Sequence, residues 1–395
     1  TKCTLCFILV LQTRCLLRNW VEQLKILLVM DQFDDSNNGT TISARRFAAE
    51  LKRHGNEVKV VSIGKPAPDR YIVKEFKLLP LADHIVKKQG MAFARPDRET
   101  LEEAIGWADV VHFLMPFWLS LSGLKVARRL GTPYTGAFHV QPENITYTLG
   151  MGRINSVNTA IYRFFRDNFY NRITHIHCPS QFIAGELRKN GYTAQLHVIS
   201  NGVDRDFVYR KLPKPEAWRD KFVILMIGRL SNEKRQDVLI DAVKKSRHAD
   251  RIRLVLAGQG PNRKKYETLA ADLAHPIVID FFEKPRLLEL LGQCDLYVHA
   301  ADAEIEAISC IEAFRSGLVP IIANSPKSAT PQFALDERSL FQAGNSADLA
   351  AKIDYWIENE SQRRMMEIRY AEHGRRYGID ACVRQIEEMF RTAIE

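Results

Sequence analysis

Several features that would assign the chain to other classes of protein are missing from its sequence. Cys3 and Cys6 form a CxxC pair with Cys15 nearby, but no second pair has the spacing of a zinc site. No long run of lysine and arginine occurs, and no aromatic string of the kind that RNA-binding domains use. These absences disfavour a zinc domain and a nucleic-acid-binding protein.

Cysteine is scarce, with seven residues, an odd number, in a chain of 395. A disulfide framework would use paired cysteines, whereas the later cysteines lie in segments with strand or helix patterns. These are Cys178, Cys294, Cys310 and Cys382. We therefore expect a reducing compartment and a cytoplasmic protein.

The apolar run at residues 5–11 is too short to cross a bilayer. It has the length of a signal-peptide core, but Arg14 and Arg18 follow it and no small-residue cleavage site does. A clean strand pattern begins only at Leu24. We therefore expect residues 1–23 to be an extension outside the fold.

The composition is that of a globular protein, with 46% hydrophobic and 26% charged residues. A chain of this length is expected to form two domains of about 150 to 200 residues each. The net charge of +9 predicts an anionic partner. We favour a phospholipid surface or a phosphorylated small molecule over nucleic acid.

From Leu24 onward, short apolar segments alternate with longer amphipathic ones. This alternation is typical of an α/β fold with a doubly wound parallel sheet. It stops at a charged stretch that contains Pro213 and Pro215 and then restarts with a strand pattern at residues 222–228. We expect a first Rossmann-like domain at 24–204, a linker at 205–221, a second Rossmann-like domain at 222–375, and a C-terminal helix at 376–395 that by analogy crosses back to the first domain.

Ligands of open parallel sheets bind beyond the carboxyl ends of the strands, so the residues that follow each strand are candidates for function. Arg229 follows the strand at 222–228, and Lys234 stands at the expected start of the next helix. A guanidinium fork, an ammonium group and a helix N-terminus all favour phosphate oxygens. The pattern predicts a diphosphate site, with solvated surface cations as the alternative.

Glu304 follows the strand at 296–300, and Glu312 lies eight residues later on an expected helix. On one helix the two residues would be about 12 Å apart along the axis. Paired glycosidase carboxylates are separated by roughly 5 to 9.5 Å, so the spacing excludes a hydrolytic pair. We interpret the two carboxylates as separate contacts to the hydroxyls of an extended ligand; the alternative for either one alone is a solvated helix residue.

These residues stand in a recognisable order. Glu304, seven residues and Glu312, followed by AFRSGLVPIIA, resemble the E-x7-E motif of the retaining family-four glycosyltransferases. GRLSNEK at 228–234, LVLAGQGP at 254–261 and NGVD at 201–204 resemble other segments of the same family. The resemblance extends from Leu24 to the C-terminus.

The resemblance implies a GT-B fold, in which two Rossmann-like domains face each other and the second holds most of a nucleotide-diphosphate sugar. It implies that Arg229 and Lys234 bind the diphosphate, that Glu304 binds hydroxyls of the transferred hexose, and that Glu312 binds the ribose. The donor would be a UDP-hexose or GDP-mannose, with no cofactor and no metal. Asp34 and Asp35 lack the context of a metal-binding DxD loop.

Two residues of the first domain fit the same resemblance. Gly39 follows the first strand and would let a backbone approach the donor closely, although an ordinary turn glycine is an equal alternative. His139 follows the strand at 132–138 and matches the histidine of the family that contacts the donor sugar; the alternative is a structural histidine. We therefore predict His139 and Glu304 as catalytic.

The chain departs from the family at one point. Where the family commonly has E-x-F-G-L, this chain has Glu304, Ile305, Glu306, Ala307 and Ile308. We expect the backbone at Ala307 and Ile308 to contact the sugar still, because alanine costs little outside positive-φ geometry.

The acceptor is expected to bind the first domain. Residues 153–172 interleave arginines with aromatic residues, a pattern found in helices that lie on anionic membranes. The hypothesis is a lipid or glycolipid acceptor and a peripheral enzyme on the inner face of the membrane; the alternative is a helix that buries its aromatic face.

Three functions other than glycosyl transfer are alternatives for this sequence. A nucleotide-sugar epimerase or a silent sugar-nucleotide-binding protein would share the GT-B fold. A dinucleotide-dependent oxidoreductase would need a GxGxxG after the first strand, and its nearest approach, at 258–261, is interrupted by Pro261.

Overall fold

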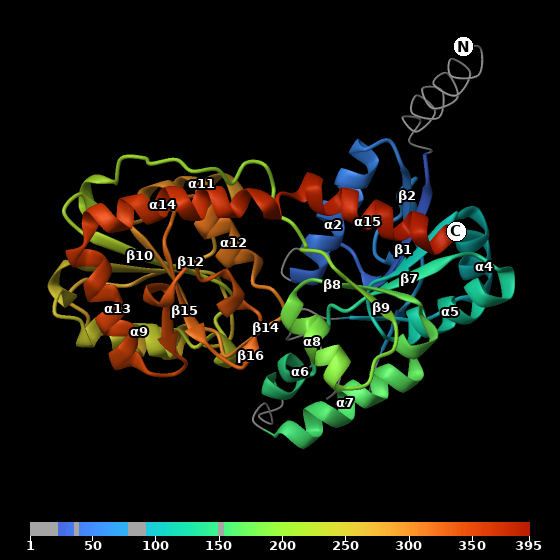
Figure 1. Cartoon of the computed structure of the whole chain (residues 1–395), viewed down its shortest axis with the longest axis horizontal. Helices are drawn as coiled ribbons and strands as arrows, with labels where there is room; N and C mark the ends of the chain where they lie inside the picture. Colours follow the sequence, from blue (N-terminus) through green and yellow to red (C-terminus); the bar gives the residue numbers. More distant parts are fainter. Residues whose placement is uncertain (1–22, 35–38, 78–91, 149–153) are drawn as a thin grey trace, which may run out of the picture.

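The computed structural model describes residues 23–34, 39–77, 92–148 and 154–395. Apart from Gln23, the extension predicted at residues 1–23 lies outside these ranges. Figure 1 shows two α/β lobes side by side, the first coloured blue to green and the second yellow to red. Each lobe contains a parallel sheet with helices on its faces, which confirms the predicted fold class.

The first sheet has seven strands in the order β3-β2-β1-β6-β7-β8-β9, and all its paired strands run parallel. The order reverses beside β1, which creates the switch point where such sheets bind ligands. The strands are β1 (Lys25–Gln32), β2 (Glu57–Ile63), β3 (Arg70–Ile72), β6 (Val110–Phe113), β7 (Tyr134–Ala137), β8 (His175–Cys178) and β9 (Gln195–Val198). A separate antiparallel pair joins β4 (Glu75–Phe76) to β5 (Phe93–Ala94).

The helices of this lobe cover both faces of its sheet. The first is amphipathic, with buried residues such as Phe47 and Leu51 facing the strands. The helices are α2 (Gly39–Arg53), α4 (Arg98–Trp107), α5 (Trp118–Leu130), α6 (Pro142–Thr148), α7 (Asn155–Asn168), η1 (Tyr170–Arg172) and α8 (Gln181–Lys189).

The second sheet is also parallel, with six strands in the order β12-β11-β10-β13-β15-β17. Its central strand FVILMI is buried almost throughout, as expected for a strand covered on both faces. The strands are β10 (Phe222–Ile227), β11 (Ile252–Ala257), β12 (Val278–Asp280), β13 (Leu296–His299), β15 (Pro320–Asn324) and β17 (Leu340–Gln342); β14 (Ala303–Glu304) and β16 (Lys327–Ser328) form a separate parallel pair.

The strands of this sheet are connected by η3 (Asn232–Lys234), α9 (Gln236–Lys245), η4 (Ala249–Arg251), α10 (Arg263–Leu269), α11 (Lys284–Gln293), α12 (Ile308–Arg315), η5 (Thr330–Phe333) and η6 (Glu337–Ser339). The short helix η2 (Glu216–Trp218) precedes the sheet, and α13 (Ser346–Glu358), α14 (Glu360–Gly374), η7 (Arg375–Tyr377) and α15 (Ile379–Ile394) follow its last strand.

The buried hydrophobic residues form two cores, one in each lobe. Phe207, in the stretch expected to be a linker, is buried in the second core. The last helix, α15, lies on the first lobe in Figure 1 and contributes Val383, Ile386 and Phe390 to its core. The chain therefore crosses between the lobes twice.

A polar network holds α15 against α2. His54 lies between Glu387 at 3.0 Å and Asp380 at 3.2 Å, and Arg53 pairs with both Asp380 and Glu50. Glu50, His54 and Asp380 have the spacing of metal ligands, but their carboxylates are already balanced by arginine side chains. The network explains how a C-terminal helix becomes part of the first domain.

For the described part of residues 153–172, the structure confirms the alternative interpretation, a helix that buries its aromatic face. Tyr162, Phe165, Phe169 and Tyr170 are buried in the first core, and only Phe164 is exposed. Hydrophobic burial therefore accounts for the pattern. Separately, no helix among the described residues combines the length and apolar character needed to span a bilayer. The four cysteines that the structure describes are buried thiols, not disulfides.

Candidate active site

Two glycines draw together the loops that follow β10 and β11. A Cβ atom on Gly258 would lie 2.0 Å from the carbonyl oxygen of Gly228, and one on Gly260 would lie 2.5 Å from that of Leu230. Side chains are therefore excluded at both positions. These glycines of the GQGP segment shape the strand-end loops rather than forming a dinucleotide fingerprint.

The helix expected to start at Lys234 starts instead at Gln236, which corrects the position of Lys234. Arg235 adopts a left-handed conformation with φ of 55°, which separates η3 from α9. Lys234 therefore ends a short 3-10 turn instead of opening a long helix. Arg229 lies on the loop just before this turn, and its carbonyl oxygen accepts a hydrogen bond of 2.8 Å from the Gln236 amide.

Lys234, predicted to bind the diphosphate, and Glu304, predicted to bind the sugar, lie in direct contact. The Lys234 ammonium donates to Glu304 Oε1, and His299 Nε2 lies 3.0 Å from the same oxygen. His299 is in turn held by the Tyr297 hydroxyl at 3.1 Å from Nδ1. Burial raises the pKa of Glu304, but Lys234 and His299 outweigh it and hold that pKa at about 2. Glu304 is therefore a permanent carboxylate.

Glu304 is carried on β14 rather than in an irregular loop. The two residues of β14 pair with β16, and the carbonyl oxygen of Glu304 accepts a 2.9 Å hydrogen bond from Ala329 N. Only 8% of Glu304 is exposed. The carboxylate is thus fixed in place before any ligand arrives, a property expected of a group that recognises substrate hydroxyls.

The expectation that Ala307 is unstrained is wrong. Its φ is 67° and its ψ is 66°, in the left-handed region, immediately before α12 begins at Ile308. Left-handed geometry costs an alanine roughly 1 to 2 kcal/mol because its Cβ approaches the following carbonyl oxygen. The glycine of the family pattern would suit this backbone, so the conformation persists despite the substitution.

Replacing Ala307 by glycine should therefore be tolerated unusually well. Relief of strain at positive φ offsets the extra entropy that glycine gives the unfolded chain. We expect the free energy of unfolding, measured by urea titration, to stay within about 0.5 kcal/mol of the original protein or to rise. Ala351→Gly, on the exposed face of α13, is the control and should lose about 1 kcal/mol. Equal losses in both variants would contradict strain at Ala307.

Glu312 forms an ion pair with a residue of the first domain. It lies on α12 with its carboxylate 2.7 Å from Arg46 Nη2 of α2, and Arg46 Nε lies 3.4 Å from Asp204. Burial raises the pKa of Glu312, and Arg46 opposes that effect. Arg46 thus supplies the charge that favours an ionised Glu312.

The remaining predicted residues lie on the first domain. Gly39 opens α2, and neither packing nor positive φ among the described residues requires a glycine there. His139 follows β7 and is only 6% exposed, with its ring 5.2 Å from that of His177. Burial and the neighbouring histidines hold the pKa of His139 well below its usual range, so the ring is neutral. Close by, Gln141 Nε2 donates to Lys327 O on β16 at 3.0 Å, which joins this segment to the strand beside Glu304.

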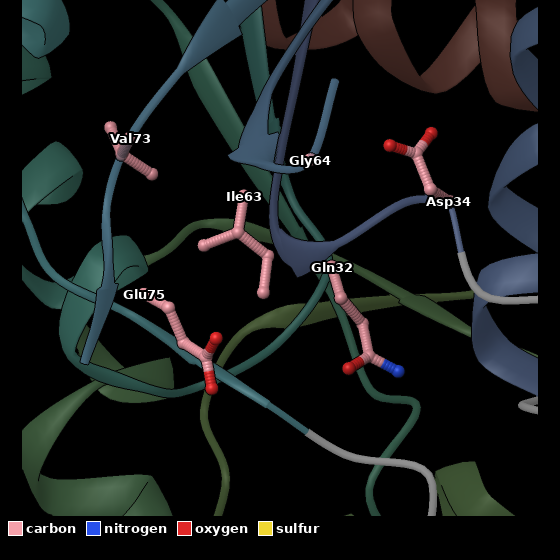
Figure 2. Close-up of a pocket in the computed structure, with 6 residues that line it drawn as sticks. All are labelled: Gln32, Asp34, Ile63, Gly64, Val73 and Glu75. Carbon is pink, nitrogen blue, oxygen red and sulfur yellow. The ribbon is translucent and has the colours of Figure 1, made fainter. Parts of the chain in front are cut away.

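The first domain also contains an open pocket of about 400 Å³ at the carboxyl ends of β1 and β2. In Figure 2 the side chain of Ile63 lies at the centre of the view, with Val73 and Glu75 to its left and Gln32 and Asp34 to its right. Asp34 accepts a hydrogen bond from Lys65 N at 3.0 Å and pairs with Arg70 at 2.9 Å. The pocket offers both apolar and polar contacts.

The structure therefore brings Lys234 into contact with Glu304. Ala307, Ile308 and Glu312 follow Glu304 along the chain, in the loop before α12 and on α12 itself. It also adds residues that the sequence analysis missed. His299 could have been found as a polar residue at the end of β13. The sequence could not identify Arg46 as a site residue, because it lies 266 positions from Glu312 on an ordinary amphipathic helix.

Two facing Rossmann-like domains, with a buried cation–carboxylate site at their junction, define the class of GT-B glycosyltransferases. Residues 37–207 match the family described as Glycosyltransferase Family 4, and residues 209–373 match Glycosyl transferases group 1. Together the two matches show that the chain belongs to the family-four, group 1 glycosyltransferases and is a glycosyltransferase.

Individual relatives are distant in sequence or cover only part of the chain. Alpha-monoglucosyldiacylglycerol synthase of Streptococcus pneumoniae is 22% identical over 320 residues, which are 76% of this chain and 71% of the relative. The structure of Anabaena HepE with UDP and glucose has a TM-score of 0.72 at 16% identity, covering 94% of this chain and 100% of that one. The catalytic domain of cholesterol-alpha-glucosyltransferase from Helicobacter pylori shares 52% identity over 40% of this chain and 98% of its own, at a TM-score of 0.39.

Proposed function

We propose that this glycosyltransferase moves a hexose from a nucleotide-diphosphate sugar to a hydroxyl-bearing membrane lipid, with retention of anomeric configuration and without a metal. The observation that carries the proposal is the contact between Lys234 and Glu304. A cation that suits phosphate and a carboxylate that suits sugar hydroxyls are adjacent here, as are phosphate and sugar in a nucleotide sugar. Glu312, one turn into α12, is then available to the ribose.

In the proposed reaction the bond between the anomeric carbon and the diphosphate oxygen breaks, and its electron pair stays on the diphosphate. The acceptor oxygen forms its bond on the same face of the sugar, and the acceptor proton passes to the departing oxygen. Arg229 and Lys234 stabilise the negative charge that develops on the diphosphate. Glu304 orients the sugar through its hydroxyls, and neutral His139 offers a hydrogen bond near the reacting carbon.

Three observations support a lipid acceptor. The relative from Streptococcus pneumoniae is named for a diacylglycerol product. The net charge of +9 favours an anionic surface, as in a peripheral enzyme on the inner face of a membrane. The pocket of Figure 2 lies at the same sheet edge as His139 and combines apolar Ile63 and Val73 with polar Gln32 and Glu75.

A variant that fills this pocket should impair use of the acceptor and leave use of the donor unchanged. We expect Ile63→Trp to lower glycolipid formation by about tenfold or more, because a lost pocket contact is worth roughly 10- to 200-fold. Slow hydrolysis of the donor should be unchanged. The control is Ile368→Trp, a half-exposed position on α14. Equal loss of both activities in Ile63→Trp would show that the pocket does not hold the acceptor.

The function itself is tested by nucleotide-diphosphate release. The protein is incubated with UDP-glucose, UDP-galactose, UDP-N-acetylglucosamine or GDP-mannose, with anionic vesicles that contain diacylglycerol, a glycolipid or a sterol. We expect one donor to be consumed, at a rate that depends on one lipid and that EDTA leaves unchanged. Donor binding without turnover on any acceptor would favour a silent binding protein, and release of an epimerised sugar would favour an epimerase.

A further inference from the structure

Glu304 ends β14 and is followed by a loop at residues 305–307, called the Glu304 loop, which is anchored in the first domain as well as in the second. The first two residues of this loop, Ile305 and Glu306, both form hydrogen bonds to residues of the first domain. Ser180, the N-cap of α8, donates from Oγ to the carbonyl oxygen of Ile305 at 2.7 Å. Asn201 donates to Glu306 Oε2 twice, from its backbone N at 3.0 Å and from Nδ2 at 2.8 Å.

Asn201 lies where the chain passes between the domains. Two residues later, Val203 pairs with Gly378 in an isolated parallel bridge, and Val203 N donates to Tyr377 O at 2.8 Å. The outgoing chain near residue 203 and the returning chain near residue 378 are therefore side by side. A rotation of one domain against the other must bend the chain here. The hydrogen bonds between Asn201 and Glu306 therefore depend on how the two domains are oriented.

Glu306 is a distinctive residue for this position. It occupies the third place of the segment where the family pattern has phenylalanine, and only 2% of it is exposed. Among the residues that the structure describes, no cation forms an ion pair with it. The groups that face it are Ser200 and Asn201 after β9, the Tyr377 hydroxyl in η7 and the Cys382 thiol on α15. A buried acid without a counter-charge has a strong preference for its neutral form.

We propose that Glu306 is a positioning residue that couples the Glu304 loop to the domain junction, so that donor affinity depends on the protonation of Glu306. The contact requires the two domains to be together, whereas an open arrangement would expose the carboxyl group to water. The inference rests on the proposed role of Glu304 in binding the donor sugar.

The sign of the pH dependence follows from burial. Burial raises the pKa of Glu306 to about 7, although Ser200 and Asn201 oppose it. In an open arrangement the pKa returns toward the ordinary 4.5 for glutamate. The closed contact therefore binds the proton more tightly, is strongest below pH 4.5, weakens as the pH rises from 4.5 to about 7, and levels off above that.

The test compares donor dissociation constants of the original protein and Glu306→Gln by calorimetry at pH 6 and pH 8. Glutamine keeps the oxygen that accepts from Asn201 and is neutral at both values. We expect the affinity of the glutamine variant relative to that of the original protein to rise by up to about tenfold between pH 6 and pH 8. Glu99→Gln, an exposed glutamate on α4, is the matched control and should follow the original protein.

A second variant covers the case in which Glu306→Gln folds poorly. Asn201→Ala removes one of the two bonds to Glu306 and should weaken donor binding at pH 6, and adding Glu306→Ala should cost less than it costs in the original protein. Additive losses would overturn the coupling. Parallel pH profiles for the original protein and Glu306→Gln would also overturn it.

Failure of this inference can be told apart from failure of the proposed function. If Glu304→Gln weakens donor binding while Glu306→Gln changes nothing, only the role of Glu306 is wrong. If Glu304→Gln leaves donor binding intact at both pH values, the proposed donor site is wrong.

Discussion

Replacing Glu304 by glutamine should lower kcat/KM for the donor by about 100- to 1000-fold, the range measured for loss of one preorganised polar group at a reacting centre. The charge of the carboxylate is permanent because its pKa is about 2. Its hydrogen bonds to sugar hydroxyls are therefore charge-assisted, and glutamine cannot reproduce them. Glutamine also leaves the partly buried Lys234 ammonium without its ionic partner.

A double variant separates lost chemistry from lost stability. Lys234→Met together with Glu304→Gln leaves no unpaired charge, so we expect the free energy of unfolding to recover relative to Glu304→Gln alone. Activity should not recover, because both donor contacts are gone. Glu337→Gln, exposed at the start of η6, is the matched control for the single variant. Near-original activity in Glu304→Gln would contradict a role for Glu304 in sugar binding.

Replacing Arg46 by glutamine should raise the donor dissociation constant by about 10- to 100-fold, since hydrogen bonds to charged groups are worth about 1.5 to 3 kcal/mol. Burial already raises the pKa of Glu312, and Arg46 is the nearest group that lowers it. Without the guanidinium, Glu312 shifts further toward its neutral form and accepts ribose hydroxyls less well.

This variant should also gain a pH dependence of definite sign. In Arg46→Gln, donor binding should tighten as the pH rises through the elevated pKa of Glu312, because the carboxylate then ionises. Lys284 and Asp204, which also face Glu312, are unchanged. Arg46→Lys keeps the charge and should restore much of the affinity. If Arg46→Lys and Arg46→Gln bind the donor equally weakly, the charge of Arg46 is not what Glu312 requires.

Much of the fold follows from local sequence patterns. Apolar strands such as FVILMI and amphipathic helices such as α2 carry periodicities that depend only on neighbouring residues. The positions of Lys234 and Glu304 after strands, and of Glu312 on the following helix, could be predicted for the same reason. The break at Arg235 could not, because a left-handed arginine has no composition signal and is fixed by the 3.1 Å pair that Arg235 makes with Asp302.

The residues that escaped prediction act across the domain junction. Arg46 reaches Glu312 over 266 positions, and Asn201 reaches Glu306 over 105. Their partners are set by how the two domains sit together, which no local pattern encodes. The interpretation of the aromatic residues near α7 stayed open for a related reason, since the same pattern suits a membrane face or a core and only packing decides between them.

The most direct test of the account is the anomeric configuration of the product. The protein is incubated with the donor that it consumes and its lipid acceptor, and the linkage of the purified glycolipid is read from the proton coupling at the anomeric carbon by NMR. We predict that an α-configured donor gives an α-linked lipid and that Glu304→Gln forms it at least about 100-fold more slowly. A β-linked product, or undiminished formation by Glu304→Gln, would contradict retaining transfer at this site.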